Sequence, residues 1–179
     1  MKANRLILIT AACLAASIAA RAQGAPANPM VAAAQEIYDR QSKFIMASAD
    51  QMPPDKYSFK PTADQRSFAA IIAHLAQANF AVCAILSDTT APQDWKVAES
   101  DPKDKLVAAV NASFDFCSKA LANLQDSKLG DTVKFFGGRP ATRARALIEL
   151  TDDLEDHYSQ LASYMRLNGM LPPSAQPKK

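Results

Sequence analysis

Apolar residues recur at every third or fourth position in four segments of the chain, which is the spacing of helices that each bury one face. These segments are residues 30–51, 67–88, 101–124 and 141–168. None of them is apolar on all sides, so each helix needs neighbours that cover its apolar face. The pattern therefore predicts an all-α fold, and four helices of this length predict a four-helix bundle.

The connections between the predicted helices constrain their directions. The first helix stops at Met52-Pro53-Pro54, and the short stretch from there to Ser67, the predicted N-cap of the second helix, suits antiparallel neighbours. The link 88–100 has 13 residues, which at up to ~3.3 Å each can return along a bundle ~30 Å long. The second and third helices can therefore run parallel. The fourth helix ends at Asn168-Gly169, a predicted left-handed cap.

The first 22 residues have the pattern of a secretory signal peptide. Lys2 and Arg5 precede an apolar run over residues 6–20, and a small-residue cleavage site, Ala20-Arg21-Ala22, follows. We predict cleavage after Ala22 and a mature protein that is periplasmic or secreted. The alternative is an N-terminal membrane anchor, but the run has only 15 residues against the ~20 that a spanning helix needs.

The predicted organisation is a signal peptide over residues 1–22, a flexible leader over 23–29, the bundle over 30–168 and a C-terminal tail over 169–179. The whole chain has 20 basic and 18 acidic residues, but three of the basic ones belong to the signal peptide. The mature chain therefore has 17 basic and 18 acidic residues, a net charge of −1. It lacks the basic patch that nucleic-acid binding requires and a basic amphipathic helix for a membrane surface, so we expect neither partner after cleavage. The oligomeric state, a homodimer included, stays open.

Two cysteines remain in the mature chain, Cys83 in the second predicted helix and Cys117 in the third. Cys83 lies 16 residues after Ser67 and Cys117 lies 16 residues after Asp101, so parallel helices that start level place the two thiols level. Antiparallel helices would separate them by ~16 Å, beyond the ~7 Å between Cα atoms that a disulfide spans. In an oxidising compartment this register favours a disulfide, and the alternative is two buried free thiols.

The mature chain has two histidines, His74 in the second predicted helix and His157 in the fourth, each beside an apolar stripe. Asp153 lies four residues before His157, so both project from the same side of that helix. Two imidazoles and a carboxylate suit a divalent ion such as zinc, nickel, manganese or iron, with Glu149 as a spare ligand. Asp156 and the other acids nearby are interpreted as a solvated face. The alternative to a metal site is a set of ordinary hydrogen-bonded polar groups at the bundle surface.

Other chemistries have no sequence signature in this chain. It has no glycine-rich phosphate loop, no G-x-S-x-G elbow and no C-x-x-C pair. The two histidines and the acids beside them are therefore the candidate functional residues.

Two stretches of the sequence match a known family pattern. Residues 52–83, MPPDKYSFKPTADQRSFAAIIAHLAQANFAVC, and residues 155–174, EDHYSQLASYMRLNGMLPPS, closely resemble the exported branch of the DinB-like superfamily. Members carry a motif of the form MPxxKYxFxPTxxxRSFxxxxxHxAxxNxxxC and a late EHYGQLxxYLRLNGxxPPS. The resemblance covers residues 30–174 and implies a four-helix bundle of up-down-down-up topology.

The resemblance also implies a divalent metal held by one histidine of the second helix and an H-x-x-x-H pair of the fourth. By position His74 matches the first ligand and His157 the last, whereas the middle histidine is Asp153 in this chain. Aspartate ligates first-row metals but disfavours softer ones, so the site either survives as two histidines and a carboxylate or loses its metal. Related families use such a site for thiol-dependent transfer or isomerisation. The resemblance thus implies a metal-dependent hydrolase or thiol transferase of unknown small-molecule substrate; the alternative is a non-catalytic binding or stress-related bundle without metal.

Overall fold

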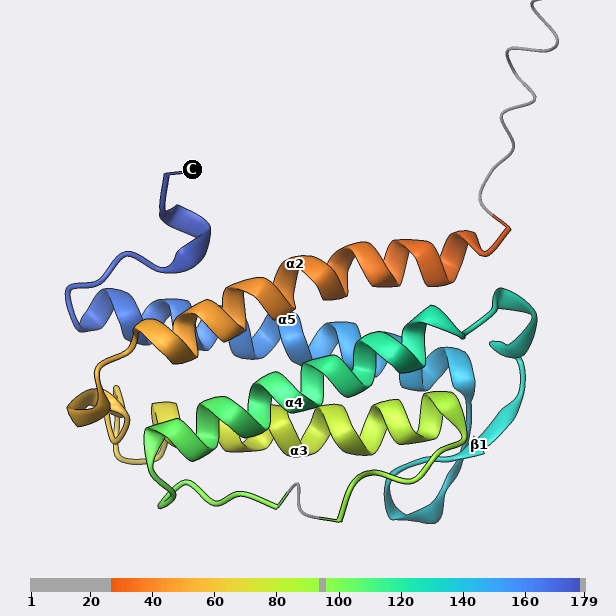
Figure 1. Cartoon of the computed structure of the whole chain (residues 1–179), viewed down its shortest axis with the longest axis horizontal. Coiled ribbons are helices and arrows are strands. Elements are labelled where there is room, and N and C mark those ends of the chain that lie inside the picture. Colours follow the sequence, from red (N-terminus) through yellow and green to blue (C-terminus); the bar gives the residue numbers. More distant parts are fainter. Residues whose placement is uncertain (1–26, 94–95, 178–179) are drawn as a thin grey trace, which may run out of the picture.

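The computed structural model describes residues 27–93 and 96–177, and the predicted signal peptide over residues 1–22 lies outside the described residues. The described chain forms four long helices: α2 (Pro29–Gln51), α3 (Phe68–Ser87), α4 (Lys103–Ala122) and α5 (Arg143–Leu167). Helices α3 and α4 run in one direction, and α2 and α5 run in the other (Figure 1). The predicted four-helix bundle of up-down-down-up topology is therefore confirmed.

Local sequence signals explain several helix ends. Ser67 caps α3, its hydroxyl accepting a hydrogen bond from an amide of the first turn at 3.0 Å, as predicted. Thr142 caps α5 in the same way at 3.2 Å, so this helix begins at Arg143, close to the predicted start. At the other end of α5, Gly169 has a φ of +74° and the Met170 amide donates to the Met165 carbonyl at 2.9 Å. These features form the left-handed cap that the sequence predicted.

Two details of the links differ from the prediction. Helix α4 begins at Lys103, two residues after Asp101, because the Asp101 carboxylate accepts a hydrogen bond from the Ala98 amide and does not cap the helix. The link between α4 and α5 contains a hairpin, in which β1 (Thr132–Lys134) pairs antiparallel with β2 (Pro140–Thr142). Strands of three residues are too short to give a readable alternation of apolar and polar positions.

The other regular segments are single turns of 3-10 helix. They are η1 (Pro54–Lys56), η2 (Asp126–Lys128), η3 (Phe136–Gly138) and η4 (Pro173–Ala175). The η3 turn forms the tip of the hairpin. The η4 turn lies in the C-terminal tail, where the Ser174 amide donates to the Tyr158 hydroxyl at 2.9 Å and so fastens the tail to α5.

Helix α3 is the most enclosed element of the core. It packs against α4 and α5, and α2 packs against the same two helices from the other side. Among the described residues, α3 is the one helix with the length and apolar composition to cross a membrane, and 61% of that stretch is buried inside the bundle. Burial of this kind is expected of the core helix of a bundle.

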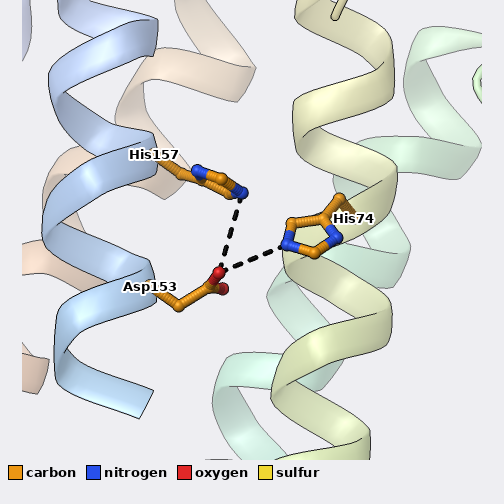
Figure 2. Close-up of side chains that lie close together, drawn as sticks. All are labelled: His74, Asp153 and His157. Atoms are coloured by element: carbon orange, nitrogen blue, oxygen red, sulfur yellow. Dashed lines mark hydrogen bonds and ion pairs between the residues drawn. The ribbon is translucent and has the colours of Figure 1, made fainter. Parts of the chain in front are cut away.

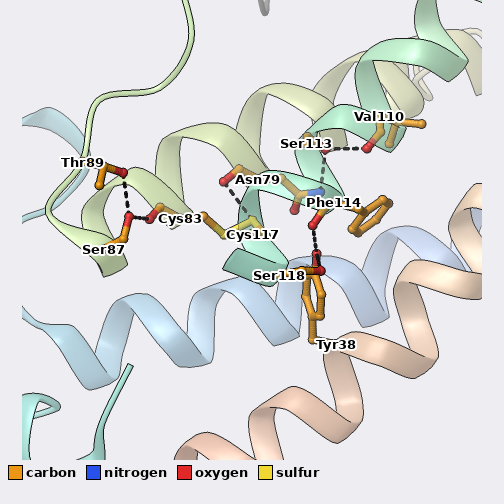
Figure 3. The surroundings of a disulfide bond; sticks show 10 residues. All are labelled: Tyr38, Asn79, Cys83, Ser87, Thr89, Val110, Ser113, Phe114, Cys117 and Ser118. Atoms are coloured by element: carbon orange, nitrogen blue, oxygen red, sulfur yellow. Dashed lines mark hydrogen bonds between the residues drawn. A yellow bond between two sulfur atoms is a disulfide. The ribbon is translucent and has the colours of Figure 1, made fainter. Parts of the chain in front are cut away.

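A disulfide joins α3 to α4 (Figure 3). The Cα atoms of Cys83 and Cys117 lie 5.2 Å apart, and neither residue has exposed surface. The bond confirms the predicted pairing and the level, parallel register of the two helices. Beside it Asn79 Nδ2 donates to Ser113 Oγ at 3.1 Å, so a hydrogen bond crosses the same interface.

Candidate metal centre

Three polar side chains meet between α3 and α5 (Figure 2). His74 projects from α3, and Asp153 and His157 project from successive turns of α5. Asp153 Oδ1 lies 3.2 Å from His74 Nε2 and 3.7 Å from His157 Nε2. The two imidazole rings meet edge to face with their centroids 4.6 Å apart. The fold thus brings together the three residues that the sequence singled out, which we call the triad.

The spacing of the triad is close to that of ligands around one ion. One donor atom from each residue lies within 4.8 Å of the other two. Bonds of ~2.0 to 2.2 Å in tetrahedral geometry place donors ~3.3 to 3.6 Å apart, so the widest pair has to close by up to ~1.5 Å through side-chain shifts before all three reach a common ion. Two imidazole nitrogens and one carboxylate oxygen are a donor set that divalent first-row metals accept. The residues present therefore fit a metal ion.

Hydrogen bonds orient the His157 ring toward the other two residues of the triad. Its Nδ1 donates to Asp156 Oδ2 at 3.1 Å, and Gln160 donates to the same carboxylate oxygen at 2.9 Å. With the proton on Nδ1, His157 Nε2 carries its lone pair rather than a proton, which is the tautomer that metal ligation needs. His74 differs, because its Nε2 donates to the Asp153 carboxylate, and a metal ion would have to displace that proton.

A cation from the start of α3 also reaches the triad. Arg66 is exposed and lies two residues before α3, with its Nη1 3.3 Å from His157 Nε2. The guanidinium donates to the same lone pair that a metal ion would take. Arg66 and a metal ion therefore compete for His157, and the side chain of Arg66 has to move aside when an ion binds.

Burial sets the protonation state of His157. Its side chain is 9% exposed, against 34% for His74 and 25% for Asp153. Desolvation lowers the pKa of His157 below its ordinary 6.5; Asp153 opposes this shift, whereas the neighbouring His74 and Arg66 add to it. His157 is therefore neutral near pH 7, the state in which imidazole binds metals.

Glu149, the spare ligand suggested by the sequence, lies outside the triad. It precedes Asp153 by one turn of α5 and forms an ion pair with Arg145, with Oε2 and Nη2 2.5 Å apart. Glu149, Asp153 and His74 line a pocket of about 100 Å³ between α3, α5 and the hairpin. Glu149 therefore contributes to this pocket and leaves three residues as the ligand set.

Two partners of His157, Asp156 and Arg66, were not predicted from the sequence. Asp156 was interpreted as part of a solvated face, although it directly precedes His157 and holds its Nδ1. Arg66 is 91 residues away in the chain, so no local signal exists. In an antiparallel pair such as α3 and α5, four residues forward on one helix correspond to four residues back on the other. Contact between His74 and Asp153 thus puts His157 level with residue 70, one turn from Arg66.

Comparisons with known proteins agree with this fold. The family model of the DinB superfamily matches residues 37–161. A DinB-like protein from Bacillus cereus has a similar structure, with a TM-score of 0.63, 16% identity and coverage of 78% of this chain and 93% of that one. A DinB-like protein from Bacillus subtilis has a TM-score of 0.63 and 18% identity, with coverage of 84% of this chain and 100% of that one. A conserved protein from Enterococcus faecalis has a TM-score of 0.60 and 19% identity, with coverage of 75% of this chain and 94% of that one. At these identities the structural likeness shows the fold alone, and no curated protein matches the sequence.

Proposed function

The chain belongs to the DinB superfamily, and from this premise we propose that His74, Asp153 and His157 hold a divalent metal ion. One observation carries the proposal: a donor atom from each of the three residues lies within 4.8 Å of the other two. The tautomer of His157, fixed by Asp156, supports it, because in this tautomer Nε2 carries its lone pair rather than a proton.

The three residues have different parts in holding the ion. His157 is the buried, neutral anchor, held in place by Asp156. His74 and Asp153 are partly exposed and complete the set from the solvent side. Three protein ligands leave coordination positions for water or substrate, which is the arrangement of catalytic rather than structural metal sites.

The proposed activity is a metal-dependent hydrolysis or thiol transfer on a small molecule. A bound divalent ion supplies a Lewis acid that lowers the pKa of a coordinated water or thiol. Zinc, nickel, manganese and iron are the candidate ions. Because one ligand is a carboxylate, the harder ions among them should bind more tightly here than at a site of three histidines.

We further propose that the mature protein is periplasmic or secreted. The predicted signal peptide over residues 1–22 supports export, and the Cys83–Cys117 disulfide supports an oxidising compartment, where such bonds persist. N-terminal sequencing of the protein isolated from the exported fraction tests this point. We expect the chain to begin at Gln23, and a chain that keeps its first residues in the cytoplasmic fraction would contradict the proposal.

A second candidate is a metal-free bundle in which the triad is a structural polar cluster. The contact between Arg66 and His157 Nε2 favours this candidate, because the guanidinium already satisfies that nitrogen. His74 and Asp153 likewise satisfy each other. In such a protein, substitution of the triad would change the free energy of unfolding and leave the metal content at background.

The metal content of the protein separates the two candidates. Untagged protein, purified without chelators and analysed by mass spectrometry of its metals, is expected to hold close to one equivalent of one transition metal. His74→Ala and His157→Ala should each remove it, whereas Asp152→Asn, an exposed acid beside Asp153, should not. Less than ~0.1 equivalent in the unsubstituted protein, unchanged in the histidine variants, would contradict the metal site.

A further inference from the structure

A small pocket adjoins the triad on one side only. His74 and Asp153 line this pocket of about 100 Å³, whereas His157 is absent from its lining. The charged groups Arg66 and Asp156 contact His157 instead. Arg66 and Asp156 therefore occupy the side of the triad at His157, and the pocket lies on the other side, at His74 and Asp153.

Besides His74 and Asp153, the pocket is lined by the polar residues Asn79 and Glu149 and by four apolar side chains. Val82 from α3 and Leu150 from α5 are buried, Ala78 is half-buried, and Phe136 from the hairpin tip completes the wall. The volume of about 100 Å³ has room for about three groups the size of a water molecule, at ~30 Å³ each. Of its two carboxylates, Asp153 belongs to the triad and Glu149 is paired with Arg145. The pocket thus suits a short uncharged group.

Phe136 is held at the edge of this pocket although it is 42% exposed. The hairpin tip is closed by a hydrogen bond of 2.9 Å from the Gly138 amide to the Phe135 carbonyl. Gly137 and Gly138 have φ values of +69° and +74°, which glycine adopts without strain. The Phe135 ring packs on the Phe136 ring with centroids 4.6 Å apart. The tip therefore places an aromatic surface beside the triad where a ligand can meet it.

We propose that this pocket is the subsite for a short apolar group of the substrate, with Phe136 as a specificity-determining wall. The proposal rests on the proposed function, since the ion would hold the polar head group. The substrate class is then a small molecule with a metal-binding head group and an aliphatic tail of about three carbons. The tail points away from Arg66, toward Val82 and Leu150.

If pocket volume were the criterion for the ligand site, a different pocket would be selected. Three larger pockets on the described surface, of about 370, 500 and 250 Å³, have no residue of the triad in their lining. A ligand there cannot reach the proposed ion. The smaller pocket is the one in which a head group can contact the triad while a tail contacts an apolar wall.

A chain-length series tests the subsite in metal-loaded protein. Alkyl hydroxamates from acetyl to hexanoyl bind divalent ions through two oxygens and do not reduce the disulfide. We expect the affinity, measured by calorimetry, to rise by about fourfold for each of the first three added methylenes and then to level off. Phe136→Ala should reduce the gain in affinity that each added methylene produces. A series that is flat in the unsubstituted protein would overturn the proposal.

Two matched variants control for general effects of added bulk. Ala78→Leu fills the pocket and should abolish the dependence on chain length while acetohydroxamate still binds. Ala109→Leu makes the same change at a half-buried position of α4 that lines a different pocket, and it should keep the full dependence. Equal slopes in the Ala78→Leu variant and the unsubstituted protein would count against the subsite.

Metal-free protein separates failure of the subsite from failure of the metal site. In methyl-labelled protein, 1-butanol should produce saturable chemical-shift changes at Val82 and Leu150, and Ala78→Leu should remove them. If these changes occur but no metal binds, the subsite stands and the proposed function fails. If metal binds but neither the butanol shifts nor the hydroxamate increments appear, the metal site stands and the subsite is wrong.

Discussion

On one side, helix α3 packs against α4 through the Cys83–Cys117 disulfide, which has no exposed surface. On its other side α3 faces α5 through His74 and Asp153, whose side chains are 34% and 25% exposed. The same helix therefore makes one buried interface with α4 and one partly exposed interface with α5. Cys83 and the Asn79 amide contact α4, whereas His74, Ala78 and Val82, four residues apart from one another, line the pocket beside α5. Asn79 lies between the two faces, since it also lines that pocket.

The two sides of α3 therefore have different roles: the α4 side stabilises the fold, and the α5 side carries the candidate site. A covalent bond and buried apolar side chains fix the position of α3 against α4. The α5 side can then leave polar atoms unburied next to a pocket, because it does not have to hold the helix in place alone. Substitutions on the α4 side should therefore change the free energy of unfolding, and substitutions on the α5 side should change binding.

The largest expected effect is on the α4 side. Replacing both Cys83 and Cys117 with alanine should lower the free energy of unfolding by about 3 to 4 kcal/mol, because the bond closes a loop of 34 residues that is otherwise free in the unfolded chain. Denaturant titration measures this loss. Metal affinity should stay the same, and a parallel collapse of metal binding in the still-folded variant would break the contrast between the two interfaces.

The next effect is a gain on the α5 side. Asp153→His restores the histidine that the family resemblance implies and should tighten zinc or nickel binding by about tenfold, because imidazole is the softer ligand. Competition with a chromophoric chelator measures the affinity. Asp152→His, which adds a histidine at an exposed neighbouring position, should leave it unchanged. Weaker zinc and nickel binding in Asp153→His would mean that the triad does not have the proposed geometry.

A smaller gain is expected from Arg66. Arg66→Gln removes the cation that competes at His157 Nε2, so metal affinity should rise by about threefold, the size of a single hydrogen bond. Arg145→Gln is the matched control, since Arg145 pairs with Glu149 and not with His157. The chelator competition used for Asp153→His detects the change. A loss of affinity in Arg66→Gln would show that Arg66 assists the ion instead of competing with it.

The smallest effect is a dependence of stability on pH. The pKa of His157 in the folded protein is lowered from 6.5 by burial, so folding holds this imidazole neutral. The stability that depends on neutral His157 is present above pH 6.5 and is lost as the pH falls through the lower folded-state pKa. Thermal unfolding of metal-free protein from about pH 8 to about pH 5 measures the loss. In His157→Asn the curve should be flatter, and an equally steep curve would assign the loss to other groups.

The fold could be predicted because its signals are local. Helical periodicity, the Ser67 cap and the glycine after α5 each depend on a few neighbouring residues. The disulfide followed from the starting points of two parallel helices, even though α4 begins two residues later than predicted. The hairpin was missed because three-residue strands carry no periodic signal.

The candidate site also contains contacts that local sequence predicts and contacts that it does not. Asp153 and His157 lie four residues apart on one helix, so the sequence pairs them directly. The distances from His74 to Asp153, from Arg66 to His157 and from Phe136 to the pocket depend on how helices and hairpin pack. Sequence periodicity contains no information on these contacts, and the packing in three dimensions supplies it.

X-ray absorption spectroscopy of the metal-loaded protein tests the central claim most directly. We predict a first shell with two imidazole nitrogens and at least one oxygen at ~2.0 to 2.2 Å, with the outer scattering that imidazole rings produce. His74→Ala and His157→Ala should each reduce that imidazole signal, since these are the two histidines of the chain. A first shell of oxygen atoms without imidazole scattering would contradict the assignment of the ion to His74, Asp153 and His157.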